Sequence, residues 1–265
     1  INTKKIYRKK VANRRLRMIK VAILGYGTVG SGVVEVLTTN AGIIAKRAGQ
    51  EVGVKYVLDL RDFPGDPIQS KVVHDFQVIL DDPEVDIVVE TMGGTKPAYE
   101  FVKKALLAGK SVCTSNKELV AAYGAELVHL AKSKSVNFLF EASVGGGIPV
   151  IRPLNQSLTA DKILKINGIL NGTTNYILTK MAKEGSDFDV VLKEAQELGY
   201  AEKDPTADVE GYDACRKIAI LTSLAYGKQV NYEEVYTEGI TKITAEDFKY
   251  AEKLEAAIKI FGSSR

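Results

Sequence analysis

Residues 199–217, GYAEKDPTADVEGYDACRK, concentrate groups that could do acid–base chemistry. Asp213 and Lys217 stand four residues apart, which places them one turn apart on the same face of a helix. A carboxylate that holds a lysine in place gives a pair able to move a proton at a reacting oxygen. The spacing alone also fits an exposed salt bridge, which is its commoner meaning. We expect Gly199 to end the preceding helix and Asp208 to cap the helix that carries the pair.

A second chemical signal is the turn GYGTVG at residues 25–30, which matches the pattern GxGxxG. It lies between the strand-like IKVAIL and an apolar helix that begins near Thr28. Gly25 and Gly27 allow the backbone to approach a pyrophosphate, the helix offers free N–H groups, and Gly30 permits close packing of helix on strand. The candidate cofactor-binding residues of this turn are Gly25, Tyr26, Gly27, Thr28, Val29 and Gly30.

The next strand ends in YVLDLRD and leaves the choice of cofactor open. Asp59 could accept a hydrogen bond from the ribose 2′-hydroxyl of NAD, Arg61 could bind the 2′-phosphate of NADP, and an ion pair between the two is equally compatible. Two later loops, TMGG at 91–94 and TSNKE at 114–118, leave strands at the same edge of the sheet. Thr91 could contact the cofactor, and Lys117, in a polar loop, could bind a carboxylate or polarise a carbonyl.

The elements that must position these groups alternate as buried strands and helices up to Glu141. Continuous apolar strands separated by helices are typical of parallel sheets. The fold class that we predict is α/β: a doubly wound, Rossmann-type parallel sheet followed by a smaller mixed α/β domain. The glycine- and proline-rich run SVGGGIPVIRP at 143–153 marks the junction. We therefore expect a dinucleotide-binding domain over 18–142, a substrate domain over 143–265, and a final helix from Thr244 almost to the chain end.

Composition narrows the classes of protein. The chain has 265 residues, 45% of them hydrophobic and 26% charged, and no apolar run approaches a membrane span of roughly 20 residues. The net charge of +3 depends on a basic arm at residues 1–17, which holds eight Lys and Arg and no acid. The rest of the chain has 28 basic and 33 acidic residues. Since the first methionine is Met18, we interpret this arm as lying outside the fold. The two cysteines and two histidines argue against a disulfide scaffold or a zinc site, and we expect a cytoplasmic, soluble protein.

LNGTTNYIL at 170–178 by itself indicates a capped helix after a strand. Taken with GYGTVGSGV, TSNKE, EASVGGGIPVI and the stretch 199–217, however, it resembles homoserine dehydrogenase in order and spacing over about residues 19–260. The resemblance implies NAD(P)-dependent interconversion of L-homoserine and L-aspartate 4-semialdehyde, on the route to threonine, isoleucine and methionine. It also implies a small-molecule substrate, a homodimer, and no nucleic-acid or membrane partner.

The resemblance assigns roles residue by residue. Glu202, Asp208 and Tyr200 would bind substrate, Asp213 would lie near the reacting group, and Lys217 would donate or accept the proton. Lys117 would lie beside cofactor and substrate, and Thr91 would contact the cofactor. A monovalent cation, usually Na⁺, would be bound by the four residues Glu141, Val144, Gly146 and Ile148, the first through its carboxylate and the others through backbone carbonyls.

The family's chain normally continues beyond the last predicted helix, so we interpret the substrate domain as incomplete relative to the family. Three other functions remain open on this sequence. The protein could be another NAD(P)-dependent reductase of small amino acids, or a truncated module that binds nucleotide or amino acid without turnover. The basic arm could instead bind nucleic acid.

Overall fold

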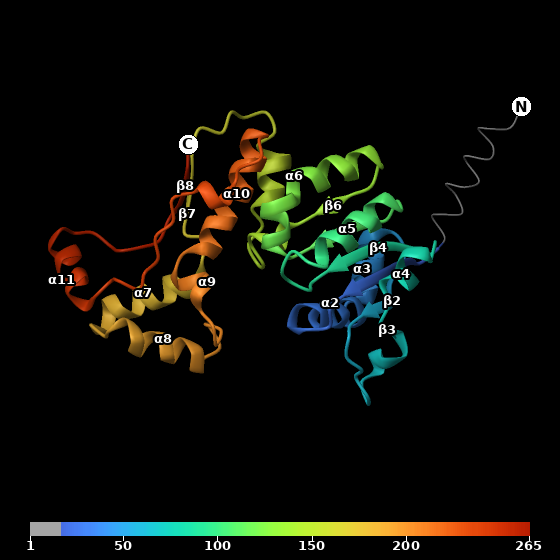
Figure 1. Ribbon diagram of the computed structural model, residues 1–265, viewed down its shortest axis with the longest axis horizontal. Helices are drawn as coiled ribbons and strands as arrows, with labels where there is room; N and C mark the ends of the chain where they lie inside the picture. The colour runs from blue at the N-terminus through green and yellow to red at the C-terminus, as the bar shows by residue number, and fades with distance from the viewer. Residues whose placement is uncertain (1–16) are drawn as a thin grey trace, which may run out of the picture. The chain divides into compact units, whose positions relative to one another are not determined.

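Six strands form one parallel sheet in the order β3-β2-β1-β4-β5-β6 (Figure 1). The computed structural model describes residues 17–265. The strands are β1 (Ile19–Leu24), β2 (Val52–Leu58), β3 (Val72–Val73), β4 (Val85–Glu90), β5 (Ser111–Thr114) and β6 (Phe138–Leu139). This order reverses direction between β1 and β4, which is the switch point where doubly wound sheets bind their ligands. The predicted fold class is confirmed.

Besides the 3-10 helix η1 (Pro67–Lys71), five α-helices connect these strands and flank the sheet (Figure 1). They are α2 (Thr28–Thr39), α3 (Ala41–Ala48), α4 (Phe76–Asp81), α5 (Ala98–Leu107) and α6 (Lys117–Ser133). The stretch VNFLFEA at 136–142 predicts a strand, but only Phe138–Leu139 forms one, because the backbone turns into a 3-10 helix, η2, at Glu141–Ser143. Neither α3, α4 nor β3 is apparent from the hydrophobic pattern, since each is too short to show a period.

The chain divides into two compact units. The first contains the sheet and extends to Leu119, with Glu126–Ala142 added; the second contains Val120–Ala125 and Ser143–Arg265. The basic arm lies outside the described residues except for Arg17, whose guanidinium is 2.5 Å from the carboxylate of Asp86. The last residue of that arm therefore contacts the first unit.

The second unit is mainly helical, with a two-stranded antiparallel sheet. Its elements are β7 (Ile166–Gly168), α7 (Gly172–Glu184), α8 (Phe188–Glu197), α9 (Thr206–Val209), α10 (Tyr212–Tyr226), α11 (Ala245–Lys253) and β8 (Gly262–Ser264). The prediction of a helix continuing almost to the chain end is wrong: α11 ends at Lys253, and β8 follows and pairs with β7. Thr244 does cap α11, with a capping box to Asp247.

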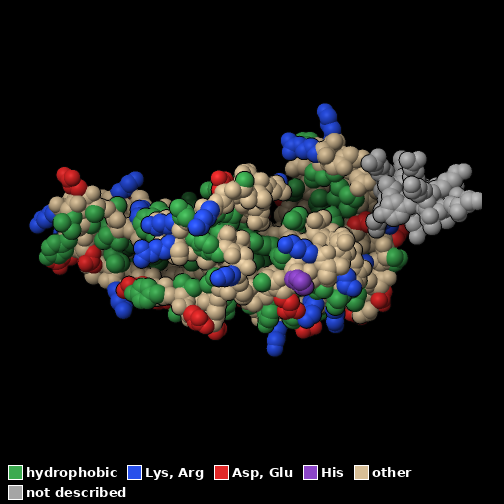
Figure 2. Space-filling view, turned by 90° about the horizontal axis from the view of Figure 1, so that it is seen from above, with side chains coloured by type: hydrophobic (Ala, Val, Ile, Leu, Met, Phe, Trp, Pro, Cys, Tyr) green, Lys and Arg blue, Asp and Glu red, His purple; other side chains and the backbone are tan. Residues whose placement is uncertain are grey.

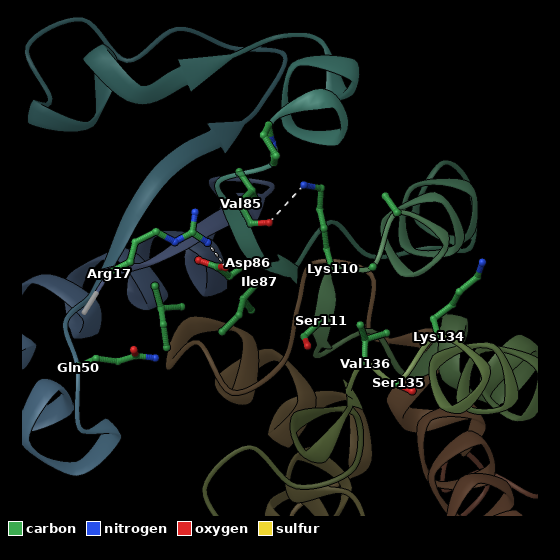
Figure 3. Close-up of a pocket in the computed structure, with 14 residues that line it drawn as sticks. Arg17, Gln50, Val85, Asp86, Ile87, Lys110, Ser111, Lys134, Ser135 and Val136 are labelled. Atoms are coloured by element: carbon green, nitrogen blue, oxygen red, sulfur yellow. Dashed lines mark hydrogen bonds and ion pairs between the residues drawn. The ribbon is translucent and has the colours of Figure 1, made fainter. Parts of the chain in front are cut away.

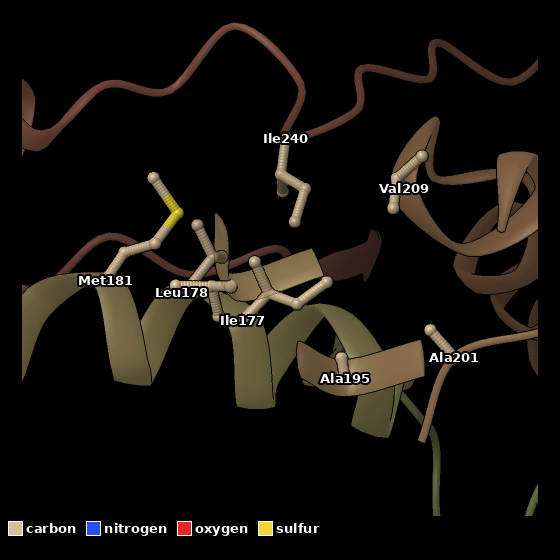
Figure 4. Packing of buried hydrophobic residues seen from close by; sticks show 8 residues of the cluster. Ile177, Leu178, Met181, Ala195, Ala201, Val209 and Ile240 are labelled. Carbon is tan, nitrogen blue, oxygen red and sulfur yellow. The ribbon is translucent and has the colours of Figure 1, made fainter. Parts of the chain in front are cut away.

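A compact apolar core fixes the helices of the second unit (Figure 4). Ile177, Leu178 and Met181 project from one side of α7, and all three are at most 1% exposed. They pack with Ala195 of α8 and Val209 of α9. Full burial of each large side chain stabilises the fold by roughly 1.5–3 kcal/mol. The beginning of α7 and the segment around α9 are thereby held close together, and both carry candidate site residues.

The surface is ordinary for a globular protein. Figure 2 shows basic, acidic and apolar side chains interspersed on the face in view. No single helix in residues 17–265 is long and apolar enough to cross a membrane; α2 and α3 reach that length and composition only as a pair bent by 77°.

Candidate active site

The glycine turn between β1 and α2 has the geometry of a phosphate cradle. Gly25 has φ +94°, in the left-handed region that favours glycine. A Cβ at Gly30 would lie 1.9 Å from the carbonyl oxygen of Gly25, so only glycine permits this packing of helix on strand. At Gly27 a Cβ would meet nothing within 4 Å, and no side chain caps the amino end of α2. The open space and the free N–H groups fit a pyrophosphate.

A cavity of about 610 Å³ adjoins this turn at the carboxyl ends of β1, β2 and β4. It is lined by Gly25, Tyr26, Gly27, Leu58, Asp59, Leu60, Arg61, His74, Phe76, Thr91, Met92, Gly93, Lys96, Pro97 and Phe101. Phe76 and Phe101 stack in its wall with ring centroids 4.3 Å apart. The size, the apolar wall and the cationic groups fit a dinucleotide that lies across these strand ends. Six predicted cofactor residues therefore lie together: Gly25, Tyr26, Gly27, Asp59, Arg61 and Thr91.

Asp59 is occupied by hydrogen bonds that hold Arg61 at the cavity. Its carboxylate accepts from the backbone N–H of Tyr26 at 2.8 Å and from that of Arg61 at 3.0 Å. The guanidinium of Arg61 donates to both carboxylate oxygens at 3.0 Å. These side-chain hydrogen bonds from Arg61 are the main reason that the pKa of Asp59 is well below its usual range. The Asp59 side chain is 8% exposed, whereas that of Arg61 is 62% exposed.

The remaining cofactor candidates are placed differently. Thr28 and Val29 are exposed in the first turn of α2. Thr91 donates its hydroxyl to the carbonyls of Leu24 and Gly25 at 3.0 and 3.1 Å, which ties the loop after β4 to the glycine turn. Lys117 does not line the cavity, and its prediction as a loop residue is wrong. It is the first residue of α6, because Asn116 caps that helix by accepting from the N–H of Leu119 at 3.0 Å.

A second cavity, of about 680 Å³, lies at the opposite edge of the sheet, beside the amino ends of β1, β4 and β5 (Figure 3). Lys110 is only 4% exposed there, and its ammonium donates to the carbonyls of Asp82 at 2.6 Å and Val85 at 3.2 Å. Burial lowers the pKa of Lys110. Since Asp82 ends α4, the lysine stabilises a helix carboxyl terminus. Ligands of doubly wound sheets bind at the other edge, so we interpret this cavity as structural.

The second unit brings the predicted proton-transfer pair together with two further residues. The Nζ atom of Lys217 lies 2.7 Å from Oδ2 of Asp213 and donates to the carbonyl of Leu170 at 3.0 Å. The side chains of Asp213 and Lys217 are 2% and 16% exposed. The exposed salt bridge that the spacing alone favours is therefore contradicted by the burial of the pair. Buried ion pairs persist only when hydrogen bonds satisfy the remaining groups.

Asn171 supplies those hydrogen bonds and was not identified as a site residue from the sequence. Its Nδ2 donates to Asp208 at 2.6 Å and to Asp213 at 2.9 Å, while its Oδ1 accepts from the backbone N–H of Thr174 at 2.8 Å as the cap of α7. One buried amide thus caps a helix and holds two acids at the same time. The signal in the sequence was the asparagine of LNGTTN, whose amide has donors as well as the capping oxygen.

The predicted role of Asp208 as a helix cap is wrong. Asp208 lies inside α9, and α10 begins after Gly211, whose φ of +83° turns the chain between the two helices without a side-chain cap. The two remaining substrate candidates, Glu202 and Tyr200, are exposed. No hydrogen bond observed in residues 17–265 joins either of them to Asp208 or Asp213. The backbone carbonyl of Glu202 accepts a hydrogen bond from the side-chain amide of Gln196 at 3.0 Å. Tyr200 is 58% exposed.

The candidate cation ligands belong to different units. Glu141 begins η2 in the first unit, whereas Val144, Gly146 and Ile148 belong to the second. A sharp turn brings the carbonyl of Ile148 within 2.2 Å of where a Cβ of Gly145 would be. Among residues 17–265 no group of three or more His, Cys, Asp or Glu side chains is arranged to hold a metal ion.

Comparison with known proteins matches both halves of the chain. The homoserine dehydrogenase family matches residues 149–264, and the family of its NAD binding domain matches residues 25–141. The chain is 44% identical to the homoserine dehydrogenase of Bacillus subtilis over 254 residues, which is 93% of this chain and 58% of that protein. It therefore spans well under two thirds of the length of this curated relative.

Solved structures agree with this match. The homoserine dehydrogenase of Thiobacillus denitrificans is 46% identical, with a TM-score of 0.89 over 94% of this chain and 58% of that one. A hyperthermophilic archaeal homoserine dehydrogenase in complex with NADPH is 30% identical, with a TM-score of 0.75 over 86% of this chain and 76% of that one.

Proposed function

The chain belongs to the homoserine dehydrogenase family, and from that premise we propose that it catalyses the NAD(P)-dependent interconversion of L-homoserine and L-aspartate 4-semialdehyde. We assign dinucleotide binding to residues 18–142 and substrate binding to residues 143–265. The observation that carries the proposal is the buried Asp213–Lys217 pair, held by Asn171 beside Asp208. A buried ion pair of this kind is costly to assemble, and proton transfer gives it a purpose.

Lys217 is the proton donor in the direction of aldehyde reduction. An ammonium has three N–H donors, and two of them are directed to Asp213 and Leu170 within the described residues. The third can donate to the aldehyde oxygen of the substrate. A bound NAD(P) would supply hydride chemistry at the carbon that bears this oxygen. In the direction of alcohol oxidation, the same Nζ atom receives the hydroxyl proton.

Asp213 orients this lysine, because its Oδ2 receives hydrogen bonds from both Lys217 and Asn171 and cannot rotate without losing one of them. Asp208 keeps a second carboxylate next to the pair, half-buried and partly accessible. Homoserine carries an ammonium group, which a carboxylate can accept as a charge-assisted hydrogen bond. We assign Asp208 and the exposed Glu202 to this ammonium, with Tyr200 at the rim of the same site.

The test of this function is turnover of L-homoserine, followed through the absorbance of the reduced nicotinamide. We expect wild-type turnover, and a loss of about 10²–10⁴-fold in kcat for Lys217→Ala, the usual contribution of a positioned general acid. Lys203→Ala removes an exposed lysine of the same stretch and serves as the matched control. A Lys217→Ala variant as fast as wild type would show that another group moves the proton. Folded wild type that binds NADPH but turns over no homoserine would favour the binding module.

Of the two cofactors, NAD(H) and NADP(H), we propose that the protein prefers NADP(H). Asp59 already accepts four hydrogen bonds, so a ribose 2′-hydroxyl would have to displace Arg61 to reach it. A 2′-phosphate would instead meet an exposed guanidinium, with His74 and Lys96 lining the same cavity. We expect tighter binding of NADPH than of NADH, and loss of that preference in Arg61→Ala but not in Arg47→Ala, an exposed control on α3. Equal preference in wild type and Arg61→Ala would contradict this assignment.

We further propose, from family membership, a homodimer in the cytoplasm and a sodium ion bound by Glu141 and the carbonyls of Val144, Gly146 and Ile148. Carboxylate and carbonyl oxygens are the ligands that hard cations accept. Activity that rises with NaCl but not with choline chloride at equal ionic strength would support the ion, and sedimentation analysis would test the dimer.

A further inference from the structure

Glu90 is a buried carboxylate that the proposed reaction has not used. It is the last residue of β4, at the switch point of the sheet, and its relative exposure is 0%. No cation of the described residues pairs with it. Its oxygens instead accept from the hydroxyl of Thr114 at 2.5 Å, the backbone N–H of Met92 at 2.8 Å and the amide of Asn116 at 3.4 Å. Thr114 is its partner in the register of β4 with β5.

Each of the three partners of Glu90 can donate a hydrogen bond to it. The backbone N–H of Asn116 donates to Oγ1 of Thr114 at 2.9 Å, so the hydroxyl hydrogen of Thr114 is free to point at Glu90. The other two partners, an N–H and an NH₂ group, can only donate. The oxygens of a carboxylate can accept from all three partners, whereas the NH₂ group of a glutamine could accept from none of them. A fully buried carboxyl group calls for a reason beyond packing.

The network holds both sides of the loop that borders the dinucleotide cavity. At the start of residues 91–94, Glu90 accepts from the N–H of Met92; at the end, Asn116 donates to the carbonyl of Gly94 at 2.6 Å. Met92 and Gly93 line the cavity. Asn116 also caps α6, whose first residue is Lys117. One carboxylate therefore fixes a wall of the cofactor cavity together with the helix end that carries a candidate site lysine.

We propose that Glu90 is a positioning residue for the nicotinamide half of the cofactor, acting through the loop 91–94 and the amino end of α6. The proposal rests on dinucleotide binding by this unit. The Asp59–Arg61 pair, which we assign to the adenosine half, follows β2, whereas the loop 91–94 follows β4 on the other side of β1 in the sheet, and Glu90 makes no hydrogen bond with that pair. Glu90 thus sets the geometry of the reacting end of the cofactor without setting the anchorage of the other end.

The experiment separates the two halves by equilibrium binding, measured by calorimetry. The probes are NADPH and adenosine 2′,5′-bisphosphate, which lacks the nicotinamide. For Glu90→Gln we expect NADPH affinity to fall about tenfold, as for one buried donor left unsatisfied. Affinity for the bisphosphate should stay within about twofold of wild type. A parallel loss for both probes would reveal general disruption of the domain, and unchanged NADPH affinity would remove the positioning role; either result overturns the proposal.

Thr114 provides a matched pair of variants, in case Glu90→Gln does not fold. Thr114→Val deletes the hydroxyl at nearly constant shape and should reproduce the selective loss of NADPH affinity, whereas Thr114→Ser keeps the hydroxyl and should bind like wild type. Equal binding by the valine and serine variants would refute the network. Because these measurements need no turnover, wild type that binds NADPH but does not oxidise homoserine would count against the proposed function and leave the role of Glu90 to be decided by binding.

Discussion

Replacing Asn171 by aspartate tests the construction of the substrate half directly. The side chain keeps its shape, but the amide that donates to Asp208 at 2.6 Å and to Asp213 at 2.9 Å becomes a third acceptor. Asn171→Asp therefore places a third carboxylate within hydrogen-bonding distance of both Asp208 and Asp213, next to the ammonium group of Lys217. We expect the variant to be less stable than wild type, by an amount that depends on pH.

The magnitude follows from the two lost hydrogen bonds. Each bond to a charged acceptor contributes about 1.5–3 kcal/mol, so the ionised variant would lose roughly 3–6 kcal/mol. Protonation limits the loss, since binding a proton costs about 1.4 kcal/mol for each pH unit above an aspartate pKa of about 3.9. The protonated carboxyl has one O–H and restores only one of the two bonds. The limit is therefore the protonation cost, about 4 kcal/mol at pH 7 and about 1.5 kcal/mol at pH 5, plus about 1.5–3 kcal/mol for the bond that stays lost. The pKa of the new carboxyl group is raised in the folded state, so the destabilisation grows as pH rises.

The matched control is on the same helix. Oδ1 of Asn175 accepts from the ammonium of Lys259 at 2.8 Å, so Asn175→Asp puts a carboxylate opposite a cation. Urea unfolding followed by circular dichroism, at several pH values between about 5 and 7, gives the stability of both variants relative to wild type. We expect a deficit that increases with pH for Asn171→Asp and none for Asn175→Asp. A deficit that is independent of pH, or equal stability of Asn171→Asp and wild type at neutral pH, would refute the inference that Asn171 holds Asp208 and Asp213 by hydrogen bonds.

Three further predictions concern other parts of the molecule. Gly30→Ala should lower both the melting temperature and the cofactor affinity, because its Cβ would lie 1.9 Å from a carbonyl oxygen. Gly27→Ala, with open space around it, should lower the cofactor affinity alone, and calorimetry and thermal melts separate the two effects. Asp59→Asn should lose the stability that the depressed pKa of Asp59 gives above the unfolded pKa of about 3.9. Its deficit in unfolding free energy should therefore shrink as pH falls from that value toward the lower pKa of the folded state. Asp213→Asn should destabilise the protein by about 3–5 kcal/mol, because the buried ammonium of Lys217 loses its counter-ion; urea midpoints equal to wild type would show that the pair is solvated.

The dinucleotide half could be predicted closely from the sequence because its signals are local. Strand β1, the glycine turn and the start of α2 are contiguous, so residue types at fixed spacing specify a single supersecondary unit. The structure contains the predicted parallel sheet, and the glycine turn lies between β1 and α2 as predicted. The failures in this half are equally local: β6 and η2 differ from the prediction because the apolar residues of VNFLFEA indicate a strand without indicating where it ends.

The choice between Asp59 and Arg61 shows a different limit. The sequence permits a ribose ligand, a phosphate ligand or an ion pair, and each is compatible with the stretch YVLDLRD. The structure adds that the backbone N–H of Tyr26 also donates to Asp59, which uses the carboxylate for the turn itself. The hydrogen-bond capacity of one side chain, and not its type, decides which residue is left for a ligand.

The substrate half could not be predicted in the same way because its site is assembled across the chain. Asp213 and Lys217 have the spacing of an ordinary surface pair, and nothing in that spacing specifies burial. Burial comes from the segment of Leu170 and Asn171, more than forty positions earlier, whose carbonyl and amide contact the lysine and the aspartate. That segment is fixed in turn by the core of α7, where Ile177 and its neighbours pack against α8 and α9. A change in that core should therefore affect proton transfer before it abolishes folding, since the pair needs both its partners within hydrogen-bonding distance.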